Sequence, residues 1–264
     1  MDIGDLVSDA LKYPLSDWTK ILMLGIILVI AGIANISRTF IADNTLISVL
    51  GIIGLIVGLL GYGYFFRIIK SSLAGISELP SFDDLVTMFI DGIKVAIVGL
   101  IYAIPAIILI LIFAASIIIS LISNPSAVAV GALIGAGIGI ILAMLYMLVI
   151  TPIIAIAVAH MAHNDGEFGA AFRFSEILDK IGSIGWGDLI IWYIVIGIIY
   201  IVLATIGGII TGLFGLISPV VTLVLMSLIV TPYLQMNIAR SIALIYSSQE
   251  VTYNSAKSGT VPSK

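Results

Sequence analysis

The sequence lacks charged residues over two long runs, and it lacks cysteine altogether. No Asp, Glu, Lys or Arg occurs from Val95 to Asn164 or from Leu189 to Ala239. A water-soluble domain cannot bury so much apolar chain and keep a polar surface, whereas a bilayer accommodates roughly 20 apolar residues per helical crossing. The absence of cysteine excludes disulfides, thiol chemistry and thiolate metal sites.

The residues that are present point the same way. Hydrophobic residues make up 61% of the 264 residues and charged residues only 10%, against about 25% charged residues in soluble domains. The net charge of -4 is spread over two membrane surfaces, so it indicates no nucleic-acid partner. We therefore expect an all-α integral membrane protein whose main partner is the lipid bilayer.

Charges and turn residues divide the chain into six expected transmembrane helices. Charged residues bracket the first two spans, Ile21–Ser37 and Asn44–Phe66. The first uncharged run is too long for one helix, and the Asn-Pro pair within Ser123–Ser126 is a turn signal that divides it. The second run divides best at Ser218-Pro219, with Gly215 as the alternative.

The basic residues predict an orientation. Of the 11 Lys and Arg residues, all but Arg38 fall on the side of the two termini and of the second and fourth loops. Loops rich in Lys and Arg stay on the cytoplasmic side of a membrane. We expect a multi-pass protein of the cell (plasma) membrane with both termini in the cytoplasm.

Two late spans share a pattern that suggests an internal repeat. Thr151-Pro152 and Thr231-Pro232 occupy corresponding positions and are followed at equal spacing by His160 and Arg240. The second span also ends on a basic residue, Arg67, but has glycines instead of the Thr-Pro pair. The alternative is that any six-span protein looks repetitive, because its alphabet is so apolar.

A short amphipathic segment precedes each pair of spans. The apolar stripes are Ile3, Leu6, Val7, Ala10 and Leu11 in the first, Phe82, Leu85, Val86, Phe89 and Ile93 in the second, and Phe168, Ala171, Phe172, Ser175 and Leu178 in the third. Such spacing is typical of helices that lie at the membrane surface. The repeat unit is then a surface helix and a helical hairpin.

These units define the expected domain organisation. Three copies, at about 1–70, 81–163 and 168–246, each cross the membrane twice, so all have the same orientation and form parallel repeats about the membrane normal. Together they make a single membrane domain over 1–246. The segment 247–264 is rich in Ser, Thr, Asn and Lys without apolar periodicity, which predicts a disordered cytoplasmic tail.

One stretch resembles a known family. Gly61–Gly75, which reads GYGYFFRIIKSSLAG, is followed by Glu78-Leu-Pro80, Phe82-Asp-Asp84 and the segment 89–94. These motifs resemble domain-of-unknown-function family 4013, whose members are multi-pass membrane proteins found mainly in archaea. The resemblance covers roughly 5–245, and it implies no activity and no catalytic residues.

Arg67 and Lys70 are the candidate contacts for a lipid phosphate. They lie one helical turn apart at the cytoplasmic end of the second span. Two basic residues fall short of the usual cluster of about 4–8, and the orientation rule alone explains them. No charge lies inside an expected span, which counts against proton-coupled transport and ion pumping.

Two proline sites are the candidates for kinks or a cavity. Pro152 and Pro232 each remove a backbone hydrogen bond, and the preceding threonines can satisfy freed carbonyls. Gln235 and Asn237 follow in the most polar stretch of any span. The complete candidate set is Thr151, Pro152, Thr231, Pro232, Gln235 and Asn237. The alternative is that the polar residues join helices by hydrogen bonds.

Histidines and glycines give weaker signals. His160 and His163, with Asp165 and Glu167, resemble a metal site but fall short of a defined zinc shell, so we predict no metal and no cofactor. Glycines recur four residues apart within several spans, at Gly131, Gly135 and Gly139, at Gly54 and Gly58, and at Gly208 and Gly212. Such spacing favours close helix packing inside the protein, with homo-oligomerisation second.

Three function hypotheses follow. The leading one is a non-enzymatic protein that binds lipid head groups or a partner membrane protein and organises the membrane. The second is a carrier or pore for an apolar or neutral small molecule, because three parallel units can surround a cavity. The third is a membrane enzyme that uses the cluster from His160 to Glu167.

Overall fold

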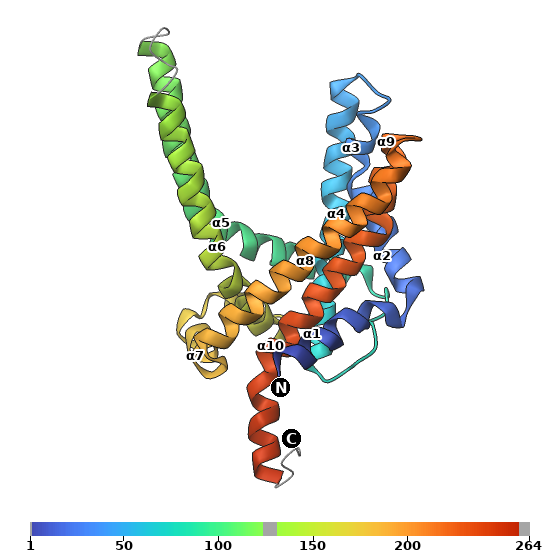
Figure 1. Ribbon diagram of the computed structural model, residues 1–264, viewed down its shortest axis with the longest axis vertical. Coiled ribbons are helices and arrows are strands. Elements are labelled where there is room, and N and C mark those ends of the chain that lie inside the picture. The colour runs from blue at the N-terminus through green and yellow to red at the C-terminus, as the bar shows by residue number, and fades with distance from the viewer. Residues whose placement is uncertain (1, 124–130, 259–264) are drawn as a thin grey trace. The chain divides into compact units, whose positions relative to one another are not determined.

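Helices are the regular elements of the described part of the chain. The computed structural model describes residues 2–123 and 131–258 (Figure 1). Its elements are α1 Ile3–Lys12, η1 Tyr13–Ser16, α2 Trp18–Ala31, α3 Ile33–Ser37, α4 Asn44–Leu73, α5 Leu85–Ser123, α6 Gly131–His163, η2 Phe168–Phe172, α7 Phe174–Ile184, α8 Trp186–Gly215, α9 Pro219–Leu225, η3 Met226–Val230 and α10 Thr231–Ser258. η1 and η2 are 3-10 helices, and η3 is a π-helix. The all-α prediction is confirmed for these residues.

The chain divides into two compact units. Unit 1 comprises 1–96 and 156–264, and unit 2 comprises 97–155. Within unit 2 the remaining parts of α5 and α6 form a hairpin, in which the Tyr146 hydroxyl donates to the Tyr102 carbonyl at 2.9 Å. Gly139 lies against the side chain of Phe113 in the same hairpin. The predicted turn residues Asn124–Ser126 lie outside the described residues.

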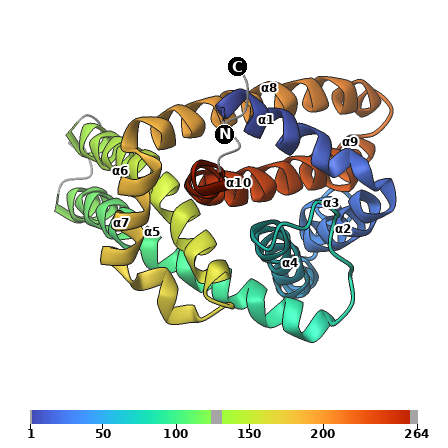
Figure 2. The ribbon, with the colours of Figure 1, turned by 90° about the horizontal axis from the view of Figure 1, so that it is seen from below.

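Unit 1 is built around α10. This helix contacts α1, α2, α4, α7 and α8, and Figure 2 shows it enclosed by several of these helices. Its inward side chains include Met236, Ala239 and Ser241, which have no exposed surface. Because α10 contacts so many other elements, the residues on it join segments that are far apart in the sequence.

Among the described residues, five helices are long and apolar enough to cross a membrane. They are Asn44–Leu73, Leu85–Ala115, Gly137–His163, Trp186–Gly215 and Pro219–Ser248, and a sixth is reached if Ile3–Ser16 and Trp18–Ala31, bent by 82°, count as one. Large apolar side chains on these helices face outward, as with Leu55 at 71% exposure. Only a hydrocarbon solvent makes such a surface favourable. The protein is therefore a multi-pass membrane protein.

The expected first span differs most from the prediction. Residues Ile21–Ser37 fall on α2 and α3, which Gly32 separates. Asp17 caps the start of α2, because its side chain accepts from the backbone N–H groups of Thr19 and Lys20. The resulting α2 has only 14 residues, fewer than a simple crossing requires.

The break between the last two spans is confirmed. α8 ends at Gly215, and α9 begins at Pro219 with the Ser218 side chain capping its first turn. Both residues that the sequence offered as alternatives therefore flank one short turn. Proline suits the first position of a helix because its missing N–H would be unpaired there in any case.

Two of the three expected surface segments form separate helices. In α1, Leu6 and Ala10 are buried against the protein, whereas Asp2, Asp5 and Asp9 keep exposed surface. In α7 the buried residues are instead Ile177, Ile181 and Ile184, and the expected Leu178 is exposed. The face of α7 that is buried within the protein therefore differs from the apolar stripe read from the sequence.

The second surface segment is continuous with a span. It forms the first turns of α5, which runs unbroken from Leu85 to Ser123. Leu85 and Val86 are exposed, whereas Met88 and Gly92 face α4. A Cβ on Gly92 would lie 1.8 Å from the Leu59 carbonyl oxygen. The glycine is therefore needed for the crossing of α4 and α5 and does not mark a helix end.

The tail is helical farther than expected. The backbone of α10 continues to Ser258, so helix replaces the predicted disorder over residues 247–258. Residues 259–264 lie outside the described residues.

Candidate functional site: a polar cleft beside Arg240

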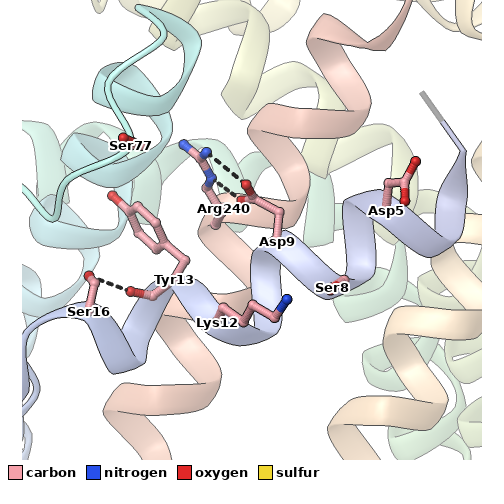
Figure 3. Close-up of a pocket in the computed structure, with 8 residues that line it drawn as sticks. All are labelled: Asp5, Ser8, Asp9, Lys12, Tyr13, Ser16, Ser77 and Arg240. Carbon is pink, nitrogen blue, oxygen red and sulfur yellow. Dashed lines mark hydrogen bonds and ion pairs between the residues drawn. The ribbon is translucent and has the colours of Figure 1, made fainter. Parts of the chain in front are cut away.

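A polar cleft of about 410 Å³ lies in unit 1 between α1 and α10. Figure 3 shows its lining residues, which come from α1, η1, the 74–84 loop and α10. They are Asp5, Ser8, Asp9, Lys12, Tyr13, Ser16, Ser77 and Arg240. The cleft is a prominent polar hollow of the described residues, and it forms where charged side chains of different elements meet.

Arg240 is the anchor of this cleft. Its Nε donates to Asp9 Oδ1 at 2.7 Å, its Nη2 to Asp9 Oδ2 at 3.4 Å, and its Nη1 to the Ile76 carbonyl at 3.1 Å (Figure 3). The guanidinium also lies 4.8 Å from the centre of the Tyr13 ring. Its side chain is only 8% exposed, compared with 43% for Asp9. The fork geometry suits this two-oxygen contact, which a lysine cannot reproduce.

The sequence of α1 places its polar residues on one face. Asp5, Asp9 and Lys12 follow at spacings of four and three residues, which share a helical face. The opposite face carries Leu6 and Ala10, which pack into unit 1. Tyr13 then begins η1, with Pro14 in its first turn, and the chain bends by 82° into α2. α1 is thereby held beside α10, with Asp9 in contact with Arg240.

The 74–84 loop forms the other wall, and side chains hold it through its carbonyl groups. Gly75, with φ of +80°, reverses the chain after α4. Donor side chains then reach successive carbonyls from four elements. Arg240 donates to Ile76, Tyr13 to Glu78, Lys20 to Leu79, Tyr64 to Pro80, and Arg67 to Ser81, Asp83 and Asp84. This network fixes Ser77 at the cleft.

The lining charges of the cleft balance. Asp5 and Asp9 contribute two negative charges, and Lys12 and Arg240 contribute two positive charges. The hydrogen bonds of Arg240 use one N–H of each nitrogen, so donors of the guanidinium remain for another acceptor. Lys12 and Asp5 are exposed on α1. The cleft therefore offers both a cationic and an anionic contact to one ligand.

The predicted lipid-phosphate pair is used differently by its two members. Arg67 Nη1 contacts Asp83 Oδ1 at 2.9 Å and two loop carbonyls, so its guanidinium belongs to the loop network. Lys70 is 47% exposed and forms a surface ion pair with Asp165 at 3.4 Å. The two side chains are thus directed to separate partners.

The Asp83 and Asp84 carboxyls complete this loop network. The Ser81 side chain, together with the Arg67 guanidinium, lowers the pKa of Asp83 below its ordinary value. Hydrogen bonds from the Thr87 side chain and backbone lower the pKa of Asp84. Both carboxyls are therefore held in their charged form, which keeps the Arg67 contact intact at neutral pH.

The predicted kink residues differ in how far they are buried. Pro152 and Pro232 are buried and Thr231 is exposed. The Thr151 hydroxyl donates to the Met147 carbonyl at 2.5 Å, whereas the carbonyl freed by Pro152 belongs to Leu148. The expectation that Thr151 satisfies the freed carbonyl is therefore wrong.

Of the polar pair in the last span, one residue has a clear function in packing. Gln235 Nε2 donates to the Gly61 carbonyl at 3.0 Å and joins α10 to α4, as the alternative of helix-helix hydrogen bonding anticipated. Asn237 is 2% exposed, and its Nδ2 has no hydrogen-bond partner in the described part of the chain. A buried amide without a partner is rare in proteins.

The histidine cluster is distributed among other contacts. His160 Nδ1 lies 2.8 Å from the Tyr246 hydroxyl and its Nε2 lies 3.0 Å from Glu176 Oε2. Glu167 pairs with Arg173 at 2.6 Å. His163 lies against the Tyr246 ring at 5.5 Å between ring centres. The cluster therefore joins α6, α7 and α10 rather than converging on one point.

A second hollow of about 180 Å³ is almost wholly apolar. It lies between α2, α8 and the junction of η3 with α10. Its lining residues are Trp18, Ile21, Leu203, Ile206, Gly207, Ile229, Val230, Tyr233 and Leu234. The sequence-based cavity prediction placed a hollow near Pro232 but named different lining residues.

Sequence reasoning missed Asp9, Lys12 and Tyr13 as site residues. Asp9 and Lys12 lie off the apolar stripe of the first expected surface helix, and no motif connects either of them or Tyr13 to a residue so distant in the chain as Arg240. A usable signal existed, because Arg240 is the first charge after the uncharged run Leu189–Ala239. A charge at that depth requires a partner, and α1 is rich in carboxylates.

The chain was compared with known proteins. It matches the model of a family described as Protein of unknown function (DUF4013) over residues 46–212, more than half of its length. No curated protein and no solved structure matched. The matched range includes Arg67 and the loop that it holds, whereas Asp9, Lys12 and Arg240 of the cleft lie outside it.

Proposed function

The chain belongs to this family of unknown function, and from that premise we propose that its polar cleft binds the zwitterionic head group of a membrane lipid. The observation that carries the proposal is the balanced charge of the lining, with two carboxylates and two basic side chains around about 410 Å³. An anion or a cation alone would leave one pair of charges unmatched, whereas a head group with a phosphate and an amine matches both.

The position of the cleft supports a lipid as the source of this head group. Arg240 lies in the second half of the candidate span Pro219–Ser248, and Ser77 lies just beyond the span Asn44–Leu73. This is the level at which spans leave hydrocarbon and phosphates meet basic side chains. Lys12 and the remaining N–H groups of Arg240 would hold the phosphate, and Asp5 would hold the amine.

Three contacts between a basic and an acidic side chain support the threefold repeat as part of this proposal. Each expected hairpin ends on a basic residue that contacts an acidic residue from the surface segment of another repeat. Arg67 contacts Asp83 at 2.9 Å, His160 contacts Glu176 at 3.0 Å and Arg240 contacts Asp9 at 2.7 Å. The first repeat thus contacts the second, the second contacts the third, and the third contacts the first. A cyclic order of this kind is what parallel repeats about one axis would produce.

The orientation and the amphipathic helices belong to the same proposal. The basic residues Lys20, Arg67, Lys94 and Arg240 all contact the loops and surface segments at one end of unit 1. By the positive-inside rule this end faces the cytoplasm of a cell membrane, with α1 and α7 at the lipid surface.

A non-enzymatic role fits the lining of the cleft. Its side chains comprise carboxylates, hydroxyls, Lys12 and Arg240, and the Ser16 hydroxyl is used to donate to the Tyr13 carbonyl. No histidine or cysteine is among these lining residues, so the arrangement lacks the usual base beside a nucleophile. We propose that the protein holds lipids, or a partner protein or a second copy through its exposed apolar helices, and organises the membrane.

The test is a titration of the purified full chain with soluble head groups. Glycerophosphoethanolamine, glycerol phosphate and ethanolamine supply both charges, the phosphate alone and the amine alone. We expect the first to bind roughly tenfold or more tightly than either part, because one further charge-assisted contact contributes about 1.5–3 kcal/mol. Lys12→Ala should remove this preference, whereas Lys70→Ala is the matched control outside the cleft.

Equal binding of all three compounds would contradict the proposal. So would a Lys12→Ala protein that binds as well as the Lys70→Ala protein. Asp5→Asn provides a second measurement, since it should weaken ethanolamine-bearing compounds and leave glycerol phosphate unaffected.

The carrier for an apolar or neutral molecule is the second candidate. The apolar hollow beside Pro232 favours it, because a π-helix and a proline in the same span allow local movement. The bonding of Gln235 to Gly61 counts against a wide path there. Uptake of neutral solutes into liposomes that contain the protein would support the carrier, and a flux equal to that of empty liposomes would reject it.

A further inference from the structure

The apolar hollow between α2, α8 and the η3–α10 junction is smaller than the polar cleft and has a mostly apolar lining. It has a volume of about 180 Å³. Apart from the Trp18 indole and the Tyr233 hydroxyl, its lining side chains are hydrocarbon or glycine. The Tyr233 hydroxyl is already used, because it donates to the Leu11 carbonyl at 2.8 Å. The hollow therefore offers shape and apolar contact, with almost no hydrogen bonding.

The backbone around the hollow is unusual. Pro232 has no N–H, so the Leu228 carbonyl lacks its normal helical donor. One residue before the proline, the Thr231 N–H donates to the Met226 carbonyl, which lies five residues back rather than four. This spacing defines the π-helix η3. This wider turn shifts Ile229 and Val230 relative to Tyr233 and Leu234. Two of the hollow's walls are thus set by the proline.

The facing helix α8 approaches the π-helix η3 closely at Gly207. A Cβ on Gly207 of α8 would lie 2.6 Å from a Val230 side-chain carbon, so the two backbones are near each other there. Next to this contact lie the larger side chains of Leu203 and Ile206. The π-turn, the glycine and these larger residues together produce a hollow that the protein's own side chains leave empty.

The surroundings of the hollow identify what fills it. α8 and η3 belong to candidate membrane spans, and Ile206 and Ile229 at the edge of the hollow are 48% and 37% exposed. Hydrocarbon is the solvent at such a surface. Trp18, which is 55% exposed, marks the membrane-water boundary, where tryptophan is enriched.

From these observations we infer that the hollow between α2, α8 and η3–α10 is a binding site for one hydrocarbon tail of a membrane lipid. An apolar cavity of about 150 Å³ stays dry and accepts a molecule of the size of benzene, so this hollow holds a tail segment of about six carbons. Left empty, its walls would lose their dispersion contacts. The site does not depend on the head-group cleft.

The experiment uses the full-length chain in bilayer nanodiscs with a phospholipid that carries a diazirine on one acyl chain. Photolysis and peptide sequencing locate the attached label. We expect saturable labelling at Ile206, Ile229 or Leu234, displaced by the same lipid without the diazirine. General contact with surrounding lipid would instead label the exposed face of α8 evenly.

Two variants that enlarge a side chain by the same amount distinguish the hollow from the general lipid-facing surface of α8. Leu203→Trp fills the hollow and should reduce labelling there by at least about fivefold, because the tail loses its contact surface. Ile209→Trp places the same side chain on α8 at a position that is 62% exposed and outside the hollow, so labelling should not change. Ile229→Phe is a second filling variant in case Leu203→Trp fails to fold.

Three outcomes would overturn the inference. The first is even labelling along α8 that neither filling variant changes. The second is labelling that Ile209→Trp lowers as much as Leu203→Trp does. The third is displacement of the label by a small neutral solute but not by unlabelled phospholipid, which would indicate a solute site instead. The head-group proposal survives each outcome, because its titration uses compounds without a tail.

Discussion

At the scale of single residues, the buried side-chain amide of Asn237 has a testable effect on stability. It lies on α10, the helix around which unit 1 packs, and it is 2% exposed with Nδ2 unpaired in the described part of the chain. Leaving a buried donor without a partner costs about 1–3 kcal/mol. Such a residue in a span is either bound to water or used when the helices move.

We predict that Asn237→Leu increases the free energy of unfolding by about 1 kcal/mol, since it removes the unpaired amide and adds apolar volume. Unfolding in a denaturing detergent, followed by circular dichroism, measures this change. Gln235→Leu is the matched comparison and should act in the opposite direction, because the Gln235 amide donates to the Gly61 carbonyl. A lower stability of Asn237→Leu would indicate that a water or another group satisfies the amide.

At the scale of elements, helix packing in unit 1 depends on backbone contacts at glycines. A Cβ on Gly25 of α2 would lie 2.1 Å from the Leu228 carbonyl oxygen, and one on Gly63 of α4 would lie 1.7 Å from the Met88 carbonyl oxygen. Leu228 carries the carbonyl that Pro232 frees from its helical bond. The close approach of α2 thus occurs where the π-helix exposes an acceptor, so a weak Cα–H contact is available there.

We predict opposite effects for two glycine-to-alanine changes. Gly25→Ala should lower the free energy of unfolding by about 2 kcal/mol or more, because the backbones must separate. Gly208→Ala should leave it unchanged or raise it by up to about 1 kcal/mol, because nothing lies within 4 Å and alanine favours the helix. Thermal unfolding of both proteins in the same detergent gives the comparison. Equal melting temperatures would show that α2 and η3 are not in contact.

The 74–84 loop carries a pH dependence with a definite sign. The pKa values of Asp83 and Asp84 are lowered in the folded protein. A lowered pKa contributes stability that is present above the unfolded value of 3.8 and is lost as the pH falls through the folded value. We expect the loop to be protected from proteolysis between pH 7 and 5 and to open below about pH 4.

Hydrogen exchange of the loop amides at several pH values measures this opening. In the Asp83→Asn protein the loop amides should lose less protection on acidification, because one of the two titrating groups is gone. An equal loss in both proteins would show that other carboxyls control the loop.

The elements differed in how far the sequence could predict them. Uncharged runs identify spans because a bilayer demands apolar length, and Ser218-Pro219 marks a turn because proline begins helices. The surface segments were less predictable, since a stripe such as that of α7 fits several helical phases when most residues are apolar. The cleft could not be predicted, because no local pattern connects Asp9 with Arg240.

At the scale of the whole molecule, the three acid-base contacts that join the proposed repeats should contribute unequally. The side-chain exposures of base and acid are 8% and 43% for Arg240 and Asp9, but 19% and 75% for Arg67 and Asp83. Ion pairs are screened as they become exposed. The contact that returns from the third repeat to the first should therefore be the strongest.

We predict a coupling energy of about 1–3 kcal/mol for the double-mutant cycle of Arg240→Ala and Asp9→Ala. This lies below the cost of breaking a fully buried pair, since Asp9 is half-exposed. The cycle of Arg67→Ala and Asp83→Ala should give about 0–1 kcal/mol from the side-chain pair. If the Arg67–Asp83 cycle gave the larger coupling energy, the contact between α1 and α10 would not be the strongest link between the repeats.

The absence of cysteine makes the orientation of the whole chain directly measurable. Single cysteines introduced as Ser8→Cys, Phe40→Cys and Ser77→Cys report on α1, on the turn before α4 and on the loop after it. We predict that an impermeant maleimide labels Phe40→Cys in intact cells, whereas the other two react only after permeabilisation, because basic ends face the cytoplasm. Six crossings place Ser8 and Ser77 on one side. Labelling of Ser8→Cys together with Phe40→Cys would mean that the short, bent α2 does not cross and that only five helices span the membrane.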